Sequence, residues 1–192
     1  MTLPLVIVHG GQSGVDRGAH EAAIENGWRV SGYMPSDQRD ELGPIPEAVA
    51  RFLVPHDKAN YAARTEANVA SASAALIVVR DTADPRVTPG TAMTIDLAAR
   101  RHLLCKIVDP TTDAALIARW IWNDLLKPRP LMLPIDGLTL DPAPMRLLVA
   151  GPRESKWRGA RVETAALLGR IARAIAEIRT PTLDQDLPRK RR

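Results

Sequence analysis

The stretch from Leu5 to Gly18, close to the N-terminus, constrains the fold of this chain more than any other part of the sequence. Its first four residues are apolar and mostly β-branched, which predicts a buried strand. Gly10, Gly11 and Gly14 then permit a tight turn, and the residues that follow predict a helix. Because the free N–H groups and the positive dipole end of such a helix face the turn, this arrangement favours a bound phosphate or carboxylate.

The spacing of the three glycines argues against two well-known phosphate-binding turns. The dinucleotide-binding fingerprint needs a wider first gap than Gly10 and Gly11 leave. A Walker loop needs a Lys-Ser or Lys-Thr pair, and none follows Gly14. An anion-binding turn of another kind and a plain strand-to-helix turn both remain open on this stretch alone.

The size and charge of the chain limit the function classes. At 192 residues it is long enough for one domain with a substantial core, expected over residues 1–178. Residues 179–192 form a basic tail that we expect to be disordered. The last four residues carry the whole formal net charge of +4, and the remaining 22 basic residues balance the 22 acidic ones. A neutral body does not favour nucleic-acid binding, which needs a clustered basic face.

Cysteine content and hydropathy bear on the compartment. Cys105 is the single cysteine, so no internal disulfide forms, and its apolar run Leu103–Val108 predicts a buried strand residue. No charged segment with an apolar leader opens the sequence, and no run approaches the ~20 apolar residues of a membrane span. We therefore expect a cytoplasmic protein in a reducing compartment.

Apolar runs alternate with helical periodicity along the rest of the chain. Strands are expected near residues 28–33, 74–79, 103–108 and 145–150. Helices are expected near residues 59–71, 90–101, 113–126 and 159–178. This alternation predicts an α/β fold with a mostly parallel central sheet, and ligands of such sheets bind at the carboxyl ends of the strands.

Two later turns repeat the opening arrangement. Gly90, Thr91 and Thr94 follow a strand and open a helix, where the two hydroxyl groups either cap the helix or donate to a phosphate. After the last strand, Gly151 precedes Arg153, whose guanidinium group either grips an oxyanion or pairs with a surface glutamate.

The helix expected at 59–71 adds a polar face. Tyr61, Arg64 and Asn68 recur at intervals of three and four residues, so their side chains share one side of the helix. Such a face either donates hydrogen bonds to a ligand or is turned to solvent.

Three segments taken together resemble one known family. They are Gly-Gly-Gln-Ser-Gly-Val-Asp-Arg at 10–17, residues 64–69 with the later Gly90-Thr91 pair, and Val-Ala-Gly-Pro-Arg-Glu-Ser at 149–155. They resemble the family of molybdenum-cofactor carrier proteins, in the Rossmann-like superfamily that includes the lonely-guy cytokinin-activating enzymes and the DNA-processing protein DprA. The resemblance implies a three-layer α/β/α fold, homo-oligomers (dimers or tetramers), and binding of molybdenum cofactor (molybdopterin), a pterin that bears a phosphate.

The resemblance assigns ligand binding to the three turns and to the polar helix face. The candidate cofactor-binding residues are Gly10, Gly11, Gln12, Ser13, Gly14, Asp16, Arg17, Arg64, Asn68, Gly90, Thr91, Thr94, Arg153, Glu154 and Ser155. One departure lies in the second turn. Pro89 stands where the family has a glycine, and proline removes one N–H donor.

The related nucleoside 5'-monophosphate phosphoribohydrolases provide the alternative function. Their loop continues Gly-Thr-x-x-Glu, and the carboxylate stabilises a developing ribosyl cation or activates water. Thr94 occupies that position here, and Asp96, two residues further along a helix, faces away. We therefore expect binding rather than hydrolysis and no catalytic residue. The ligand stays open among a pterin phosphate, a mononucleotide and a signalling nucleotide bound by a sensing module.

No metal site is expected. The four histidines, which have no ligand spacing with cysteine or carboxylate and are interpreted as surface or capping residues, are His9, His20, His56 and His102. Ser13 has no base that the sequence identifies, so nucleophilic catalysis is not favoured. The expected partner is a small phosphate-bearing ligand, with neither a membrane nor nucleic acid involved.

Overall fold

The structure is a computed structural model, and it describes residues 3–58, 60–126 and 144–179 of the 192-residue chain. The basic tail expected from residue 179 onward falls, except for its first residue, outside the described residues.

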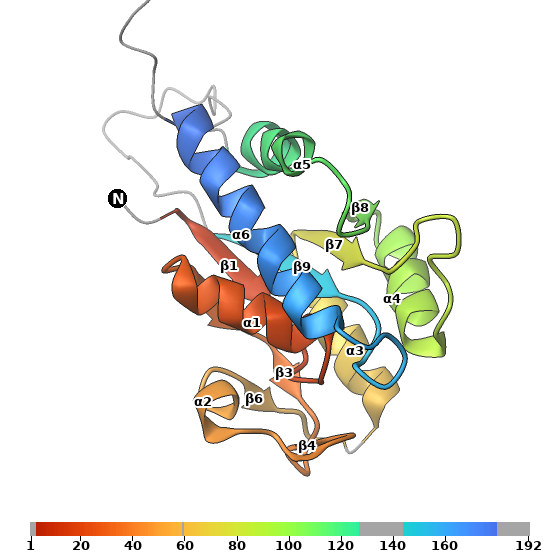
Figure 1. The fold of residues 1–192 in the computed structure, drawn as a ribbon. Helices are drawn as coiled ribbons and strands as arrows, with labels where there is room; N and C mark the ends of the chain where they lie inside the picture. Colours follow the sequence, from red (N-terminus) through yellow and green to blue (C-terminus); the bar gives the residue numbers. More distant parts are fainter. Residues whose placement is uncertain (1–2, 59, 127–143, 180–192) are drawn as a thin grey trace, which may run out of the picture.

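The central sheet has five strands, all parallel, which confirms the expected α/β class (Figure 1). The strands lie in the order β2-β1-β9-β7-β8. Their bounds are β1 (Leu5–Val8), β2 (Arg29–Ser31), β7 (Ala74–Val78), β8 (Leu104–Val108) and β9 (Met145–Ala150). The last strand of the chain thus lies in the middle of the sheet, between β1 and β7.

Placing β9 first in the numbering turns this order into 3-2-1-4-5, the strand order of a Rossmann-like sheet. In such a sheet the switch point lies between strands 1 and 4, which here are β9 and β7. The crevice outside their carboxyl ends is therefore the place where the topology itself favours a ligand.

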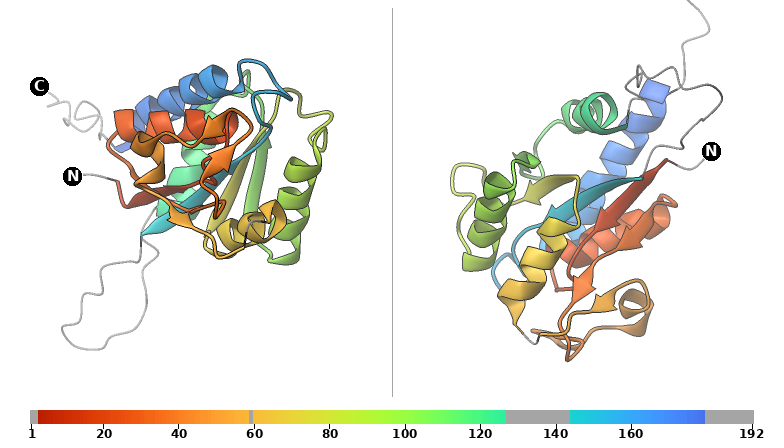
Figure 2. Two further views of the ribbon diagram at one scale, coloured as in Figure 1. Left: turned by 90° about the horizontal axis from the view of Figure 1, so that it is seen from below. Right: turned by 180° about the vertical axis from the view of Figure 1, so that it is seen from behind.

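Helices cover both faces of the sheet and complete three layers (Figure 2). One face carries α1 (Val15–Glu25), α5 (Ala114–Trp120) and α6 (Ala160–Arg179), and a large core fills the space beneath them. The other face carries α3 (Tyr61–Ala70) and α4 (Pro89–Arg100) over a second, smaller core. The expected three-layer Rossmann-like fold is confirmed.

A small lobe, residues 33–55, lies next to the carboxyl edge of the sheet, at the bottom of Figure 1. It contains β3 (Tyr33–Met34), β4 (Arg39–Asp40), β5 (Gly43–Pro44), α2 (Glu47–Ala50) and β6 (Val54–Pro55). Its own core consists of Met34, Ile45, Val49 and Leu53. The strand expected at 28–33 is divided at Gly32, where φ is 140° and an added Cβ would lie 2.0 Å from the His9 carbonyl oxygen.

Two local expectations are corrected. Cys105 is exposed rather than buried, because β8 is an edge strand of the sheet. The helix expected at 113–126 is α-helical only over Ala114–Trp120 and continues as a π-helix over Ile121–Leu126. No helix in the described part of the chain combines the length and the apolarity that a membrane crossing needs.

Gly18 sets how closely α1 approaches α6. A Cβ atom there would lie 2.2 Å from the Arg161 carbonyl oxygen. We predict that Gly18→Ala lowers the free energy of unfolding by about 1–3 kcal/mol, because the two helices must separate. Gly169→Ala in α6 is the matched control, since its Cβ would approach no atom closer than 3.8 Å. It should raise stability by about 0.5–1 kcal/mol. Urea unfolding measures both variants, and a gain in both would contradict the close contact.

Candidate functional site

A cavity of about 540 Å³ opens at the carboxyl end of β9, at the switch point of the sheet. Its floor is formed by Leu148–Gly151. The turn after β1 and the helix α3 form one side, and the first turn of α4 forms the other. Two of the three glycine turns and the polar face of α3 therefore meet at one place, and the third turn contributes Arg153.

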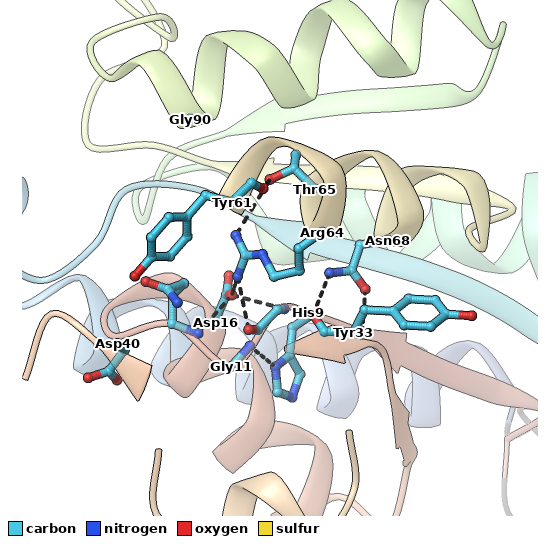
Figure 3. A network of polar contacts seen from close by, with 12 residues as sticks. His9, Gly11, Asp16, Tyr33, Asp40, Tyr61, Arg64, Thr65, Asn68 and Gly90 are labelled. Atoms are coloured by element: carbon cyan, nitrogen blue, oxygen red, sulfur yellow. Dashed lines mark hydrogen bonds and ion pairs between the residues drawn. The ribbon is translucent and has the colours of Figure 1, made fainter. Parts of the chain in front are cut away.

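The turn after β1 is held by a carboxylate of its own helix (Figure 3). Asp16 Oδ2 accepts the N–H groups of Gly10 at 2.9 Å and Gln12 at 3.1 Å. The N–H group of Gly11 donates to His9 Nδ1 at 3.1 Å. Three backbone donors that an anion would need are thus used within the protein.

Arg64 reaches this turn from α3. Its Nη1 atom donates to the Gly10 carbonyl oxygen at 2.9 Å and lies 4.0 Å from Asp16 Oδ2. Burial raises the pKa of Asp16, while Arg64 and the two N–H groups oppose that shift. Burial also lowers the pKa of Arg64, which Asp16 opposes. The β1 side of the cavity therefore holds an ion pair that is largely self-neutralising.

The start of α4 offers a donor that the protein leaves free. Thr88 is the N-cap, and its hydroxyl oxygen accepts the N–H group of Thr91 at 3.2 Å. Pro89 occupies the first helical position, where an N–H group has no partner within the helix, so the proline costs no helical hydrogen bond. The N–H group of Gly90 has no hydrogen-bond partner in the described part of the chain, and an added Cβ would meet nothing within 4 Å.

Two cations line the mouth of the cavity from the third turn. Arg153 and Lys156 both contact it. The Arg153 side chain is 44% exposed, and its Nε atom lies 3.7 Å from Glu41 Oε2. These charges are partly hydrated, so they add to the attraction of an anion without the cost of burying a lone charge.

The structure brings nine of the predicted site residues together around the cavity. They are Gly10, Gln12, Asp16, Arg64, Asn68, Gly90, Thr91, Thr94 and Arg153. Besides Asp16 and Arg64, three of these have side-chain atoms that already bond within the protein, and one is Thr91, whose hydroxyl group lies 2.8 Å from that of Thr88. Asn68 bonds to the backbone N–H and carbonyl groups of Tyr33 at 2.8 and 2.9 Å, and Thr94 donates to the Gly90 carbonyl oxygen at 3.0 Å.

The other predicted residues do not line the cavity, and they are Gly11, Ser13, Gly14, Arg17, Glu154 and Ser155. Gly14 has φ of 73°, and an added Cβ would lie 2.6 Å from the Pro152 carbonyl oxygen. Only glycine allows the first and third turns to approach so closely. Glu154 accepts the N–H groups of Gly159 and Arg161 at 2.6 and 3.2 Å, which holds the entry to α6.

Of the remaining four, Ser13, Ser155 and Arg17 hold the small lobe against the turns. Ser13 and Ser155 both donate to the carboxylate of Glu41, and the Ser155 N–H group donates to it as well. Burial would raise the pKa of Glu41, but these hydrogen bonds and Arg153 together hold it below its ordinary value. Arg17 pairs with Asp40 at 2.7 Å.

Several residues of the site were missed by sequence reasoning. Glu41 and Asp40 come from the lobe, and nothing in their local sequence indicates which turn they reach. Thr88 could have been found, because threonine directly before proline is a typical N-cap followed by a proline in the first turn. Tyr61 belongs to the polar helix face that the sequence predicts, but it is not among the predicted binding residues, and it lines the cavity.

Two histidines were wrongly interpreted as surface or capping residues. His9 is fully buried, and His20 is 5% exposed. Because His9 Nδ1 accepts the Gly11 N–H group, its proton lies on Nε2 and faces His20 Nδ1 at 3.2 Å. Burial, helped by His20, Arg17 and Arg64, lowers the pKa of His9 to about 3. Neutral His9 is therefore part of the support beneath the first turn. No group of three metal-ligating side chains occurs among the described residues.

Comparison with known proteins decides the family. Residues 7–129, more than half of the chain, match the model of the circularly permuted YpsA SLOG family. The chain belongs to this family. The position of β9, last in the chain and central in the sheet, is the arrangement that a circular permutation of a Rossmann-like sheet produces.

One solved structure resembles this member of the YpsA SLOG family over most of its length. It is a "putative molybdenum carrier protein" from Syntrophus aciditrophicus, with 25% sequence identity and a TM-score of 0.69. The match covers 88% of this chain and 95% of the other. No curated protein matches the chain. The resemblance to a molybdenum-carrier-like family, predicted from the three turns, is confirmed.

The pKa of His9 predicts how stability depends on pH. The pKa of about 3 in the folded protein lies below the ordinary histidine value of 6.5, so below about pH 6.5 the unfolded chain binds a proton that the folded protein does not. Stability therefore falls as the pH decreases, by up to ~1.4 kcal/mol per pH unit from this group.

His9→Asn is the matched variant, because its amide oxygen still accepts the Gly11 N–H group. Between about pH 7.5 and about pH 5, urea unfolding should show that the original protein loses about 2 kcal/mol more than the variant. Asp16 and His20, whose pKa values are also shifted by burial, are present in both proteins, so the difference reports on His9. Parallel stability curves would contradict a buried neutral histidine.

Proposed function

We propose that this protein carries molybdenum cofactor, holding the phosphate-bearing pterin in the cavity at the carboxyl end of β9. The observation that carries this proposal is the free N–H group of Gly90 at the positive end of α4, which opens onto the cavity. The name of the similar protein from Syntrophus aciditrophicus supports the same ligand.

The phosphate is assigned to the α4 side of the cavity. Gly90 supplies an unused backbone donor, Thr91 supplies a hydroxyl group that also bonds to the hydroxyl group of Thr88, and the helix dipole favours negative charge there. On the β1 side the N–H groups of Gly10, Gly11 and Gln12 are already bonded to Asp16 and His9. An anion on that side would also lie next to the Asp16 carboxylate, so the electrostatics favour α4.

The size and lining of the cavity fit a ring system with a phosphate. A volume of about 540 Å³ lies within the range of roughly 300–1,000 Å³ that small-molecule pockets occupy. Tyr61, Met93 and Leu148 contribute apolar surface against which a flat ring can pack. No cysteine is among the residues that line the cavity, so the lining offers no thiolate to the metal of the cofactor. We therefore propose that the lining residues contact the pterin and its phosphate rather than the metal.

The expected homo-oligomer and cytoplasmic location are part of this proposal. Leu104 on the edge strand β8 is 48% exposed, and Leu116 on α5 is 56% exposed. Exposed apolar side chains on these two elements support an interface between copies of the chain.

The Gly90 N–H group is tested by placing a charge beside it. Gly90→Asp fits the open space and places a carboxylate in the first turn of α4, so folding should be unimpaired. We predict that it weakens binding of molybdenum cofactor by at least about 10-fold through like-charge repulsion. Gly90→Asn is the uncharged control of the same shape.

Isothermal titration under anaerobic conditions measures the three affinities. The asparagine variant should bind nearly as well as the original protein. Equal weakening by both substitutions would mean that bulk, not charge, is responsible, and unchanged affinity in both would remove α4 from the site.

The alternative is a nucleoside monophosphate phosphoribohydrolase or a nucleotide-sensing module, because a free N–H group and two cations accept any phosphate monoester. Hydrolysis needs a carboxylate at the ribose. Thr94 occupies the corresponding position, and Asp96 lies outside the cavity, paired with Arg86 at 2.6 Å. Asp16 is the carboxylate in the lining, and its Oδ2 atom accepts two N–H groups.

We therefore predict that the purified protein releases no ribose 5-phosphate from adenosine or guanosine 5'-monophosphate above the rate of a heat-denatured control. Chromatographic detection of the free base measures this. Sustained turnover would replace the carrier function by the hydrolase. Binding of a mononucleotide without turnover, together with no binding of molybdenum cofactor, would favour the sensing module.

A further inference from the structure

Gln12 is buried in the wall of the cavity with its amide unused. The residue lines the cavity and is 5% exposed, and neither Nε2 nor Oε1 has a hydrogen-bond partner. Among the described residues, unpartnered buried side-chain atoms occur only in Gln12, Arg64 and Thr164, and the first two line the cavity. Buried polar groups are normally paired, so this pair of exceptions marks one place in the molecule.

The main chain of Gln12 is fixed while its side chain is not. Its N–H group donates to Asp16, which holds the backbone of the turn. Both amide atoms are enclosed in the wall, yet no hydrogen bond holds them there. Rotation of the side chain into the cavity therefore breaks no hydrogen bond, and a partner in the cavity would remove the cost of leaving both atoms unpaired. Arg64 Nε, also unpartnered, offers a second donor in the same wall.

We propose that Gln12 recognises the heterocycle of the ligand, by pairing its amide with a ring edge that carries a hydrogen-bond donor next to an acceptor. The proposal rests on the carrier function and names the part of the ligand that Gln12 contacts. A carboxamide presents one acceptor and two donor hydrogens, so only a mixed edge satisfies both of its atoms. The pyrimidinone edge of a pterin, with N–H beside C=O, is such an edge.

A phosphate is a poor partner for Gln12. Its oxygens are acceptors at neutral pH, so the amide oxygen would stay unpaired and face a negative charge. The neighbouring Arg64 is already paired with Asp16, which leaves little net positive charge on this side. The unused groups of the β1 side therefore suit a neutral polar edge rather than an anion.

The sheet places this edge opposite the phosphate site. Gln12 follows β1 and Gly90 follows β7, and β9 lies between those two strands. The floor of the cavity, Leu148–Gly151, separates the two ends. The ligand thus lies across the end of β9, with its phosphate at Gly90 and its ring edge at Gln12.

The test compares two probes on one substitution. The probes are the phosphate ester of 6-hydroxymethylpterin, which carries both ends of the ligand, and inorganic phosphate, which carries one. Gln12→Met keeps the length of the side chain and removes its hydrogen bonds. We expect this substitution to weaken binding of the ester by about 10- to 100-fold and to leave binding of inorganic phosphate unchanged. The thermal midpoint of the free protein should be unchanged or raised.

Asn68→Leu is the matched control for a structural amide. Both polar atoms of Asn68 are bonded to Tyr33, so its loss should lower the thermal midpoint. A similar drop in Gln12→Met would show that Gln12 supports the fold and would overturn the proposal. Equal ester binding by Gln12→Met and the original protein would also overturn it, while leaving the carrier function standing. No binding of the ester or of molybdenum cofactor by the original protein would instead reject the carrier function itself.

A measurement on the unsubstituted protein avoids any folding defect. The side-chain NH₂ resonances of ¹⁵N-labelled Gln12 should shift when the ester is added and should not shift with inorganic phosphate. A shift with inorganic phosphate alone, or none with a bound ester, would contradict recognition of the ring edge.

Discussion

The carboxylate of Asp16 is the interaction on which the site depends. It accepts two N–H groups of the first turn and faces Arg64, so a charge on α1, a turn after β1 and a side chain of α3 are held together. A buried carboxylate is tolerable only with such partners. Asp16 uses the N–H groups of Gly10 and Gln12, which line the cavity, so these donors are not free for an anion. This is why we propose the phosphate at α4, where Gly90 keeps its N–H group free.

The position of β9 brings these groups together, and it is the part of the fold that local sequence could not predict. The apolar runs of β1, β7 and β9 identified the strands, since a continuous apolar run is the mark of a strand covered on both faces. Their order depends on pairing between distant residues, such as Leu5 with Met145 and Ala74 with Leu147. No local periodicity encodes a partner 140 residues away. The resemblance of three motifs to one family predicted the three-layer fold but not this order of the strands.

The residue types of the site could be predicted better than their contacts. Glycines, hydroxyl groups and arginines after parallel strands indicated a phosphate-bearing ligand, and nine of the predicted residues line one cavity. The same types also hold turns to one another. Ser13 and Ser155 reach Glu41, and Arg17 reaches Asp40, because a small lobe folds against them. Whether a polar side chain binds a ligand or a neighbouring loop is decided by distant residues, so sequence alone leaves both open.

Two amides in the lining of the cavity illustrate how the structure separates these roles. Asn68 and Gln12 carry the same functional group, and both are more than nine-tenths buried. Asn68 bonds to the N–H and carbonyl groups of Tyr33, so its amide joins α3 to the backbone of β3. Gln12 has no such partner, so burial of its amide destabilises the folded protein and no hydrogen bond offsets that cost. A methionine or leucine at position 12 would stabilise the empty fold better, which is why we propose a ligand as the partner of this amide.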